Sequence, residues 1–151
     1  MREPELSARR LRTWIRLLRM TRATENHLRE YLRLHHDTTL PRFDVMAALH
    51  RARGPMKMSD LSRQLLVSNG NATAVVERLE KEGLASRAPS EGDRRVVLAE
   101  LTDKGRDVFE AQATGHRAEV DRLFSMLGHE ELDALRDILH RVEEASDGQD
   151  G

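Results

Sequence analysis

The stretch MSDLSRQLLVSNGNATAVVERLEKEGLASRAPSEGDRRVVLAEL, residues 58–101, decides the fold. Its apolar spacing predicts a short amphipathic helix over 60–66 and a second helix over 71–82. Residues 67–70 interrupt the two helices, and Gly83 suits the left-handed position that ends a helix. The first half of the stretch therefore predicts two short helices joined by a tight turn.

The second half of the stretch predicts a β-hairpin. Two apolar runs, 84–89 and 96–101, flank the turn Glu91-Gly92-Asp93-Arg94-Arg95. Residues 56–58 form a third extended segment that can join the same small sheet. A helix, a turn, a second helix and a hairpin with a basic tip are typical of a winged helix-turn-helix, which places its second helix in the major groove of duplex DNA.

Hydroxyl side chains stand where these helices should begin. We expect Ser59 to cap the first helix, Ser68 the second, and Thr102 the helix that follows the hairpin. On the second helix, the face that packs inward should carry Ala72, Val75, Val76 and Leu79.

The outward start of the second helix suits contact with DNA. Its residues are small and polar, so the backbone can approach the groove while amide and hydroxyl groups read base edges. The residues concerned are Ser68, Asn69, Gly70, Asn71 and Thr73. Arg78 lies seven residues after Asn71, on the same stripe, and should contact a phosphate. An ordinary solvated helix is the plain alternative.

The hairpin tip carries a more specific signal. Arg94 and Arg95 can enter the minor groove, where negative potential is concentrated. Asp93 would repel phosphate if it were free, so we expect it to pair with Arg95 and hold the tip in shape. The plain alternative is a charged surface hairpin. No aromatic residue lies between Lys57 and Thr102, which favours duplex DNA over a single strand.

Long amphipathic helices flank this motif. We expect helices over 5–36, 41–53, 103–127 and 130–145. The chain then divides into an N-terminal dimerisation helix, a winged helix-turn-helix domain, C-terminal dimerisation helices and a disordered tail, at 1–36, 37–102, 103–145 and 146–151. The fold class is mainly α with a small β-wing. The apolar stripes of the flanking helices are longer than one small lobe can cover, which predicts a homodimer.

Composition narrows the function classes. The net charge is only −1, but residues 1–53 carry +6 and residues 107–151 carry −8, so one end can face a polyanion. The chain has no Cys, which excludes disulfides and thiolate zinc sites. No apolar segment is long enough to cross a membrane, and nothing resembles a signal peptide, so a cytoplasmic location is expected.

No catalytic residues, cofactor or metal site are predicted. The seven His residues show no helical metal-ligand spacing, and no phosphate loop, nucleophile elbow or dinucleotide fingerprint is present. An enzyme is therefore the weak rival. A stronger rival is a winged-helix module that binds protein rather than DNA, in which Arg94 and Arg95 are merely surface charges.

Several segments together resemble the MarR family of transcription regulators. They are Met58-Ser59-Asp60-Leu61-Ser62, Leu65-Leu66-Val67-Ser68, Gly70-Asn71-Ala72-Thr73, Arg78-Leu79-Glu80-Lys81-Glu82-Gly83-Leu84, Asp93-Arg94-Arg95 and Leu101-Thr102-Asp103-Lys104-Gly105. The resemblance implies a homodimer that binds a pseudo-palindromic operator, usually as a repressor. It also implies release by a small aromatic acid, bound between the dimerisation and DNA-binding parts.

A narrower resemblance points to the branch that answers hydroxycinnamoyl-CoA thioesters. It rests on Trp14-Ile15-Arg16-Leu17-Leu18, Glu25 to Arg33, and Thr39-Leu40-Pro41-Arg42-Phe43-Asp44-Val45-Met46. Arginines 9, 12, 16 and 19 form a stripe that can hold CoA phosphates, so the candidate effector residues are Trp14, Arg16, Phe43 and Met46. In the plain alternative, the arginines are a solvated face and the aromatic side chains are core.

Overall fold

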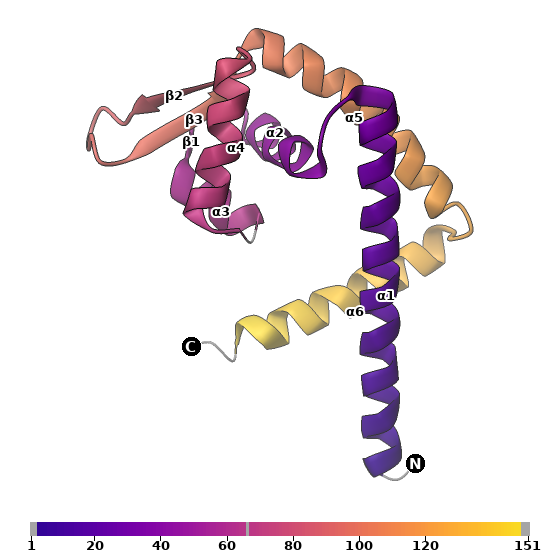
Figure 1. Ribbon diagram of the computed structural model, residues 1–151. Helices are drawn as coiled ribbons and strands as arrows, with labels where there is room; N and C mark the ends of the chain where they lie inside the picture. Colours follow the sequence, from indigo (N-terminus) through magenta and orange to yellow (C-terminus); the bar gives the residue numbers. More distant parts are fainter. Residues whose placement is uncertain (1–2, 66, 149–151) are drawn as a thin grey trace. The chain divides into compact units, whose positions relative to one another are not determined.

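A computed structural model describes residues 3–65 and 67–148, apart from the side chain of Asn69. The described chain contains helices and one three-stranded sheet, in the order helix, helix, strand, two helices, two strands and two helices (Figure 1). It forms two compact units, one ending at Arg117 and the other beginning at Ala118. The mainly helical fold with a small β-wing is confirmed.

The N-terminal helices α1 (Glu3–His36) and α2 (Leu40–Ala52) meet at a short turn. Asp37 takes a left-handed conformation with φ of 49° and ends α1. The Thr39 hydroxyl then accepts a hydrogen bond from the Arg42 amide and caps α2, with Pro41 in its first turn. The part of α1 that packs on the core is its C-terminal end, where Leu28 and Leu32 are buried.

The motif itself consists of α3 (Met58–Leu65) and α4 (Asn69–Lys81). The expectation that Ser59 caps α3 is wrong, because β1 (Met56–Lys57) passes directly into the helix and Ser59 already lies in its first turn. The Ser62 hydroxyl donates back to the carbonyl oxygens of Met58 and Ser59. The second helix begins two residues earlier than predicted and ends before Gly83, whose φ is +74° as expected.

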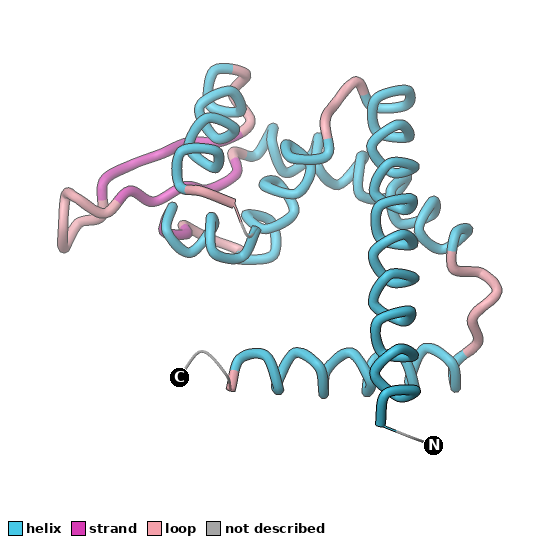
Figure 2. Tube along the Cα trace, turned by 60° about the horizontal axis from the view of Figure 1, so that its bottom comes forward, coloured by secondary structure: helices cyan, strands magenta, loops and turns pink. Residues whose placement is uncertain are grey.

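The sheet has the strand order β1-β3-β2. Strands β2 (Ala85–Pro89) and β3 (Val97–Leu101) pair antiparallel over their full length, with Arg87 opposite Ala99. Figure 2 shows these two strands running out side by side to the loop that joins them, which we call the wing together with its strands. The short β1 pairs with β3 on the other side, which confirms the third strand predicted at 56–58.

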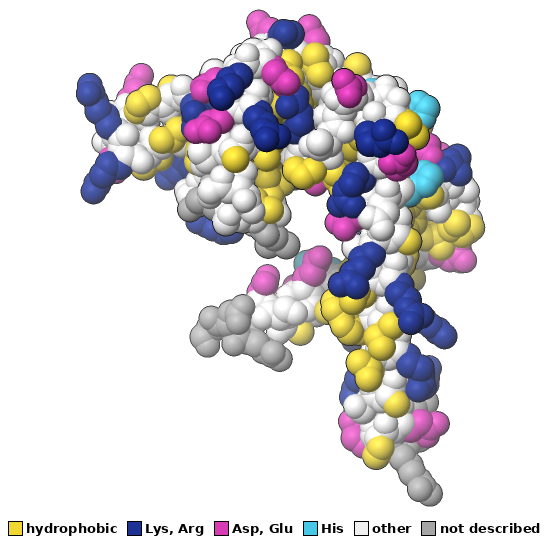
Figure 3. Space-filling view, viewed as in Figure 1, with side chains coloured by type: hydrophobic (Ala, Val, Ile, Leu, Met, Phe, Trp, Pro, Cys, Tyr) yellow, Lys and Arg dark blue, Asp and Glu magenta, His cyan; other side chains and the backbone are white. Residues whose placement is uncertain are grey.

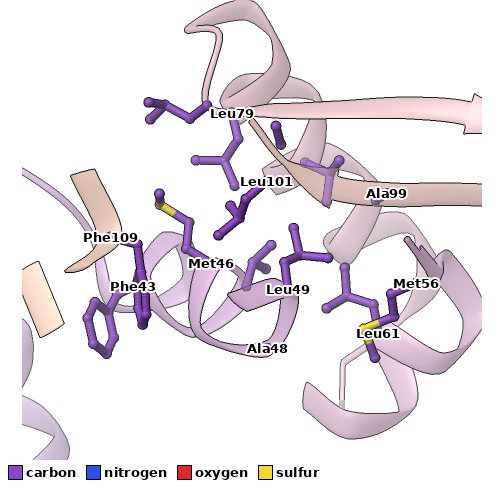
Figure 4. Close-up of a cluster of buried hydrophobic side chains, with 14 of the residues drawn as sticks. Phe43, Met46, Ala48, Leu49, Met56, Leu61, Leu79, Ala99, Leu101 and Phe109 are labelled. Carbon is purple, nitrogen blue, oxygen red and sulfur yellow. The ribbon is translucent and has the colours of Figure 1, made fainter. Parts of the chain in front are cut away.

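The core lies where α2 crosses the motif and the sheet. Leu61 from α3, Val76 and Leu79 from α4, and Met46 from α2 are fully enclosed. Figure 4 shows Met46, Leu61 and Leu79 with Leu101 and Ala99 from β3, and Val76 belongs to the same cluster. Aliphatic residues make up most of this core, and Phe43 and Phe109 close one end of it with ring centroids 5.3 Å apart. This core holds α4 and the sheet in one rigid lobe.

Thr102, the residue before helix α5 (Asp103–Leu123), makes hydrogen bonds both to α5 and to the turn after α4. The Thr102 hydroxyl accepts from the Gly105 amide at 3.0 Å and donates to the Gly83 carbonyl at 2.6 Å. The predicted cap is therefore confirmed, and it also fixes the turn after α4. The predicted helix 103–127 ends four residues early, because the Ser125 hydroxyl donates to the Arg122 carbonyl and the chain tightens into a turn.

The second unit contains α6 (His129–Asp147), whose first turn is closed by a hydrogen bond from the Gly128 amide to the Glu131 carboxylate. The expected tail 146–151 begins too early, because the Ser146 hydroxyl bonds the Val142 carbonyl and α6 includes Asp147. Residues 149–151 of that tail lie outside the described residues. Within the described chain no helix is long and apolar enough to cross a membrane.

Candidate nucleic-acid interface

Helix α4 begins with the cap that the sequence predicts. Ser68 is extended, and its hydroxyl accepts a hydrogen bond from the Asn71 amide at 3.2 Å. The Ser68 carbonyl accepts from the Ala72 amide. Ser68 and Gly70 are exposed, so the positive end of the helix faces outward with its first residues small.

The two faces of α4 differ as predicted. Ala72, Val76 and Leu79 are buried, and Val75 is half-buried. Asn71 and Arg78 are exposed on the opposite face, while Thr73 is half-buried at its edge. The side chain of Asn69, another predicted contact, lies outside the described residues. We call α4 the recognition helix.

The wing tip has the internal pair that the sequence predicts. The Asp93 carboxylate accepts from the Arg95 backbone amide at 3.0 Å and from its guanidinium at 3.2 and 3.3 Å. These bonds from Arg95 hold the pKa of the Asp93 carboxyl below its ordinary value. Arg94 is exposed and makes no hydrogen bond or ion pair with the described residues. Figure 3 shows basic side chains projecting from the end of the hairpin, at the left.

The recognition helix is also joined to the wing by ion pairs that the sequence analysis missed. Glu80 accepts from both the backbone amide and the guanidinium of Arg87, at 3.0 and 3.2 Å. Glu77 lies 3.6 Å from the same guanidinium. The three-residue spacing of the two acids on one helix was a signal for a shared partner, but nothing in the sequence placed Arg87 beside them.

A cavity of about 750 Å³ lies beside the recognition helix. Asn71, Ala74 and Arg78 line it from α4, and the end of α1 and the start of α2 form the other walls. Its lining is mainly apolar, with Leu40, Val45, Leu65 and Val75 among the contributors. Four arginines, Arg29, Arg33, Arg42 and Arg78, also line it. The arrangement suits a largely apolar molecule that carries negative charge.

The arginines of this cavity differ in their partners. Arg33 pairs with Glu30, Arg29 donates to the Asn26 side chain, and Arg42 pairs with Glu82 at the C-terminal end of α4. The Arg78 guanidinium has no hydrogen-bond or ion-pair partner among the described residues. Asp44 is the one acid that lines the cavity within the described chain, and burial, together with the nearby Glu25, raises its pKa.

Comparison with known proteins identifies the class of protein to which this fold belongs. The MarR family pattern matches residues 38–97, which span α2, the helix-turn-helix and the wing. The transcriptional regulator MhqR of Bacillus subtilis is 29% identical over 137 residues, covering 91% of this chain and 93% of MhqR. The chain belongs to the MarR family. It is a DNA-binding transcriptional regulator rather than an enzyme.

Solved structures of MarR-family proteins agree over nearly the whole chain. The regulator AbsC from Streptomyces coelicolor superposes with a TM-score of 0.82 at 27% identity, covering 98% of this chain and 97% of AbsC. The regulator Sco3205 from the same organism, solved in complex with DNA, gives a TM-score of 0.81 at 25% identity over 91% of this chain and 88% of its own. The MarR-type architecture therefore includes the flanking helices as well as the motif.

The four candidate effector residues of this MarR-family chain fall into two pairs, one on α2 and one on α1. Phe43 and Met46 are core residues, 5% and 1% exposed. Trp14 and Arg16 lie on an exposed stretch of α1. None of the four lines the cavity beside α4. Within the described residues, no group of three or more potential His, Asp or Glu ligands lies close enough to hold a metal ion.

Proposed function

We propose that this protein is a homodimeric repressor that binds a pseudo-palindromic operator and is released by a small aromatic acid or an aromatic acyl-CoA. The observation that carries the DNA part is the wing tip, where Asp93 holds Arg95 in place and Arg94 stays unpaired and exposed. A free arginine on an ordered hairpin beside a capped, polar helix start suits simultaneous contact with two grooves. Acting on chromosomal DNA, the protein works in the cytoplasm.

The proposed DNA contacts differ according to the chemistry of each side chain. Asn69, Asn71 and Thr73 read base edges, since amide and hydroxyl groups pair with bases in the major groove. Ser68 and Gly70 keep the helix start small and close to the backbone of DNA. Arg78 contacts phosphate, and Arg94 enters the minor groove.

A second copy of the chain explains the exposed apolar residues of the flanking helices. On α1, Leu11 and Trp14 are more than half exposed, and on α6 Ile138 and Val142 are too. Such contiguous apolar exposure is uncommon on a stable monomer. Covering both stripes with a partner protomer also presents two recognition helices to half-sites about 34 Å apart.

The cavity beside α4 is our proposed effector site. A volume of about 750 Å³ falls in the range of small-molecule sites, and its arginines suit a carboxylate or a phosphate. Trp14, Arg16, Phe43 and Met46 form a second candidate set. A ligand that reaches Phe43 and Met46 must first displace core side chains, so the open cavity is the more accessible of the two.

Fluorescence anisotropy with a duplex from the promoter region of the protein's own gene tests the DNA proposal. We expect tight binding that resists unrelated competitor duplex and weakens with salt. Charge reversal of Arg94 and Arg95 should abolish binding and leave the oligomeric state unchanged. Binding no tighter than to random duplex would favour a winged-helix module that binds protein.

Titration of that complex with free aromatic acids and with aromatic acyl-CoA thioesters tests the effector proposal. A ligand that acts through the cavity should lose its effect in an Arg33→Gln variant and keep it in a Trp14→Ala variant. The opposite pattern would move the site to the α1 stripe. A complex that none of these compounds disturbs would contradict ligand release of this kind.

A further inference from the structure

A backbone amide on the outer edge of the wing donates a hydrogen bond to a side chain of the recognition helix. Within the described residues β2 pairs with no strand but β3, so the backbone groups on its other edge have no partner within the sheet. The Arg87 amide on that edge donates to one carboxylate oxygen of Glu80, at 3.0 Å. The Arg87 guanidinium donates to the other oxygen, at 3.2 Å. The Glu80 carboxylate of α4 therefore binds both the backbone and the side chain of Arg87 in β2.

A second acid of α4 lies beside the same guanidinium. Glu77 precedes Glu80 by three residues, so both lie on one side of α4, and its carboxylate is 3.6 Å from the Arg87 guanidinium. The Arg87 side chain is 26% exposed, so solvent screens these contacts less than it screens a surface pair. We call Glu77, Glu80 and Arg87 the clasp.

We propose that Glu80 and Arg87 are positioning residues that fix the wing relative to the recognition helix, so that the protein binds DNA tightly only while the clasp is closed. The proposal rests on the proposed DNA-binding function. The recognition helix and the wing must enter neighbouring grooves together, and a wing held at a set angle loses less conformational freedom on binding.

The proposal and simple charge repulsion predict opposite changes in DNA affinity when Glu80 is neutralised. Glu80 carries negative charge on the helix that faces DNA, so neutralising it should strengthen binding if the charge acts only through repulsion of phosphate. If the clasp positions the wing, a Glu80→Gln change loses the charge-assisted bonds to Arg87 and weakens binding by about tenfold. Glu91, an exposed acid in the wing turn, is the matched control. Glu91→Gln should leave binding unchanged or strengthen it.

The experiment measures the affinity for the promoter duplex, and its salt dependence, in Glu80→Gln, Arg87→Gln and the double variant. We expect each single change to weaken binding at an unchanged salt slope, and the double variant to bind no worse than either single variant. If Arg87 instead contacts phosphate directly, Arg87→Gln will lower the slope by about 0.9 and Glu80→Gln will strengthen binding. That result would overturn the proposal.

Two further readouts separate this proposal from misfolding and from failure of the DNA proposal. Thermal melts identify a variant that binds weakly only because it is unfolded, and binding is compared where each variant is folded. Hydrogen exchange at the Arg87 amide needs no DNA. Glu80→Ala should accelerate it, and unchanged exchange would contradict the clasp. Should the wild-type protein bind no duplex at all, the proposed function fails, and the exchange result alone decides whether the clasp holds the wing.

Discussion

Single positions fix how closely the elements of this lobe approach one another. At Gly105, in the first turn of α5, an added Cβ would lie 1.8 Å from the Leu84 carbonyl oxygen and 2.7 Å from its carbon. Both are backbone atoms at the start of the wing, so neither can rotate away. The absence of a side chain at Gly105 therefore lets α5 begin against the wing.

We predict that Gly105→Ala destabilises the protein by more than about 2 kcal/mol, because α5 must move away from the wing. Gly92→Ala is the control, since no atom lies within 4 Å of the added Cβ there and the backbone is unstrained. Chemical denaturation of the two variants measures the difference. Equal stabilities would show that the approach of Leu84 to α5 is looser than described.

His116 makes stability depend on pH. Its ring stacks on Phe43 with centroids 4.3 Å apart, and burial lowers its pKa below the ordinary 6.5. The unfolded chain therefore takes up a proton on this side chain at a higher pH than the folded chain does. Keeping His116 neutral in the folded state costs nothing above pH 6.5, and the free energy of unfolding decreases as the pH falls below that value.

We predict that His116→Phe flattens the stability curve between neutral pH and mildly acidic pH. The difference between the wild-type and variant curves isolates this one side chain from the other six His residues. Urea denaturation across that pH range measures it. A difference curve without slope would contradict the burial argument.

The elements of the lobe are joined by caps that serve more than one element. Thr102 caps α5 and also holds the carbonyl of Gly83, the residue that ends the recognition helix region. Losing its hydroxyl leaves a donor and an acceptor unpaired at once. The geometry at the end of α4 therefore depends on a residue that begins another helix.

We predict that Thr102→Val costs about 1–2 kcal/mol of stability. Thr114→Val is the matched control. Among the described residues its exposed hydroxyl bonds only the Glu110 carbonyl within α5, so its loss should cost less than about 0.5 kcal/mol. Thermal or urea denaturation separates the two. Similar losses in both variants would contradict the dual role of Thr102.

Local signals in the sequence predicted most of the motif. The caps Ser68 and Thr102, the left-handed Gly83 and the Asp93–Arg95 pair all depend on residues within a few positions of one another. Features that join distant segments were missed, namely the clasp at Arg87 and the cavity between α1, α2 and α4. Ser59 failed as a cap because pairing of β1 with β3 decides where α3 begins. Sequence periodicity contains no information of that kind.

On the scale of the whole molecule, the dimer proposal depends on apolar residues that the described chain leaves open. Those of α6 include Leu132, Ile138, Leu139 and Val142. Leu139 follows Leu132 by seven residues, and Val142 follows Ile138 by four, so these residues lie on one side of the helix. The opposite charges of the two chain ends, +6 over residues 1–53 and −8 over residues 107–151, favour contact between the end of one protomer and the other end of its partner.

We predict that Ile138→Asp combined with Val142→Asp yields a folded monomer that binds operator DNA weakly, because two linked half-sites no longer act together. Arg136→Gln, on an exposed side chain of the same helix, should remain dimeric. Sedimentation equilibrium measures the mass of each variant, and circular dichroism checks its helix content. A wild-type protein with the mass of one chain would contradict the dimer.

We propose that the recognition helix and the wing of this MarR-family protein bind the phosphates and grooves of duplex DNA together. The most direct test is the slope of log affinity against log salt concentration for the promoter duplex, in the wild-type protein and in Arg94→Gln. We predict a steep negative slope that becomes shallower by about 0.9 in the variant if Arg94 neutralises one phosphate charge. A wild-type affinity that does not change with salt would contradict the claim.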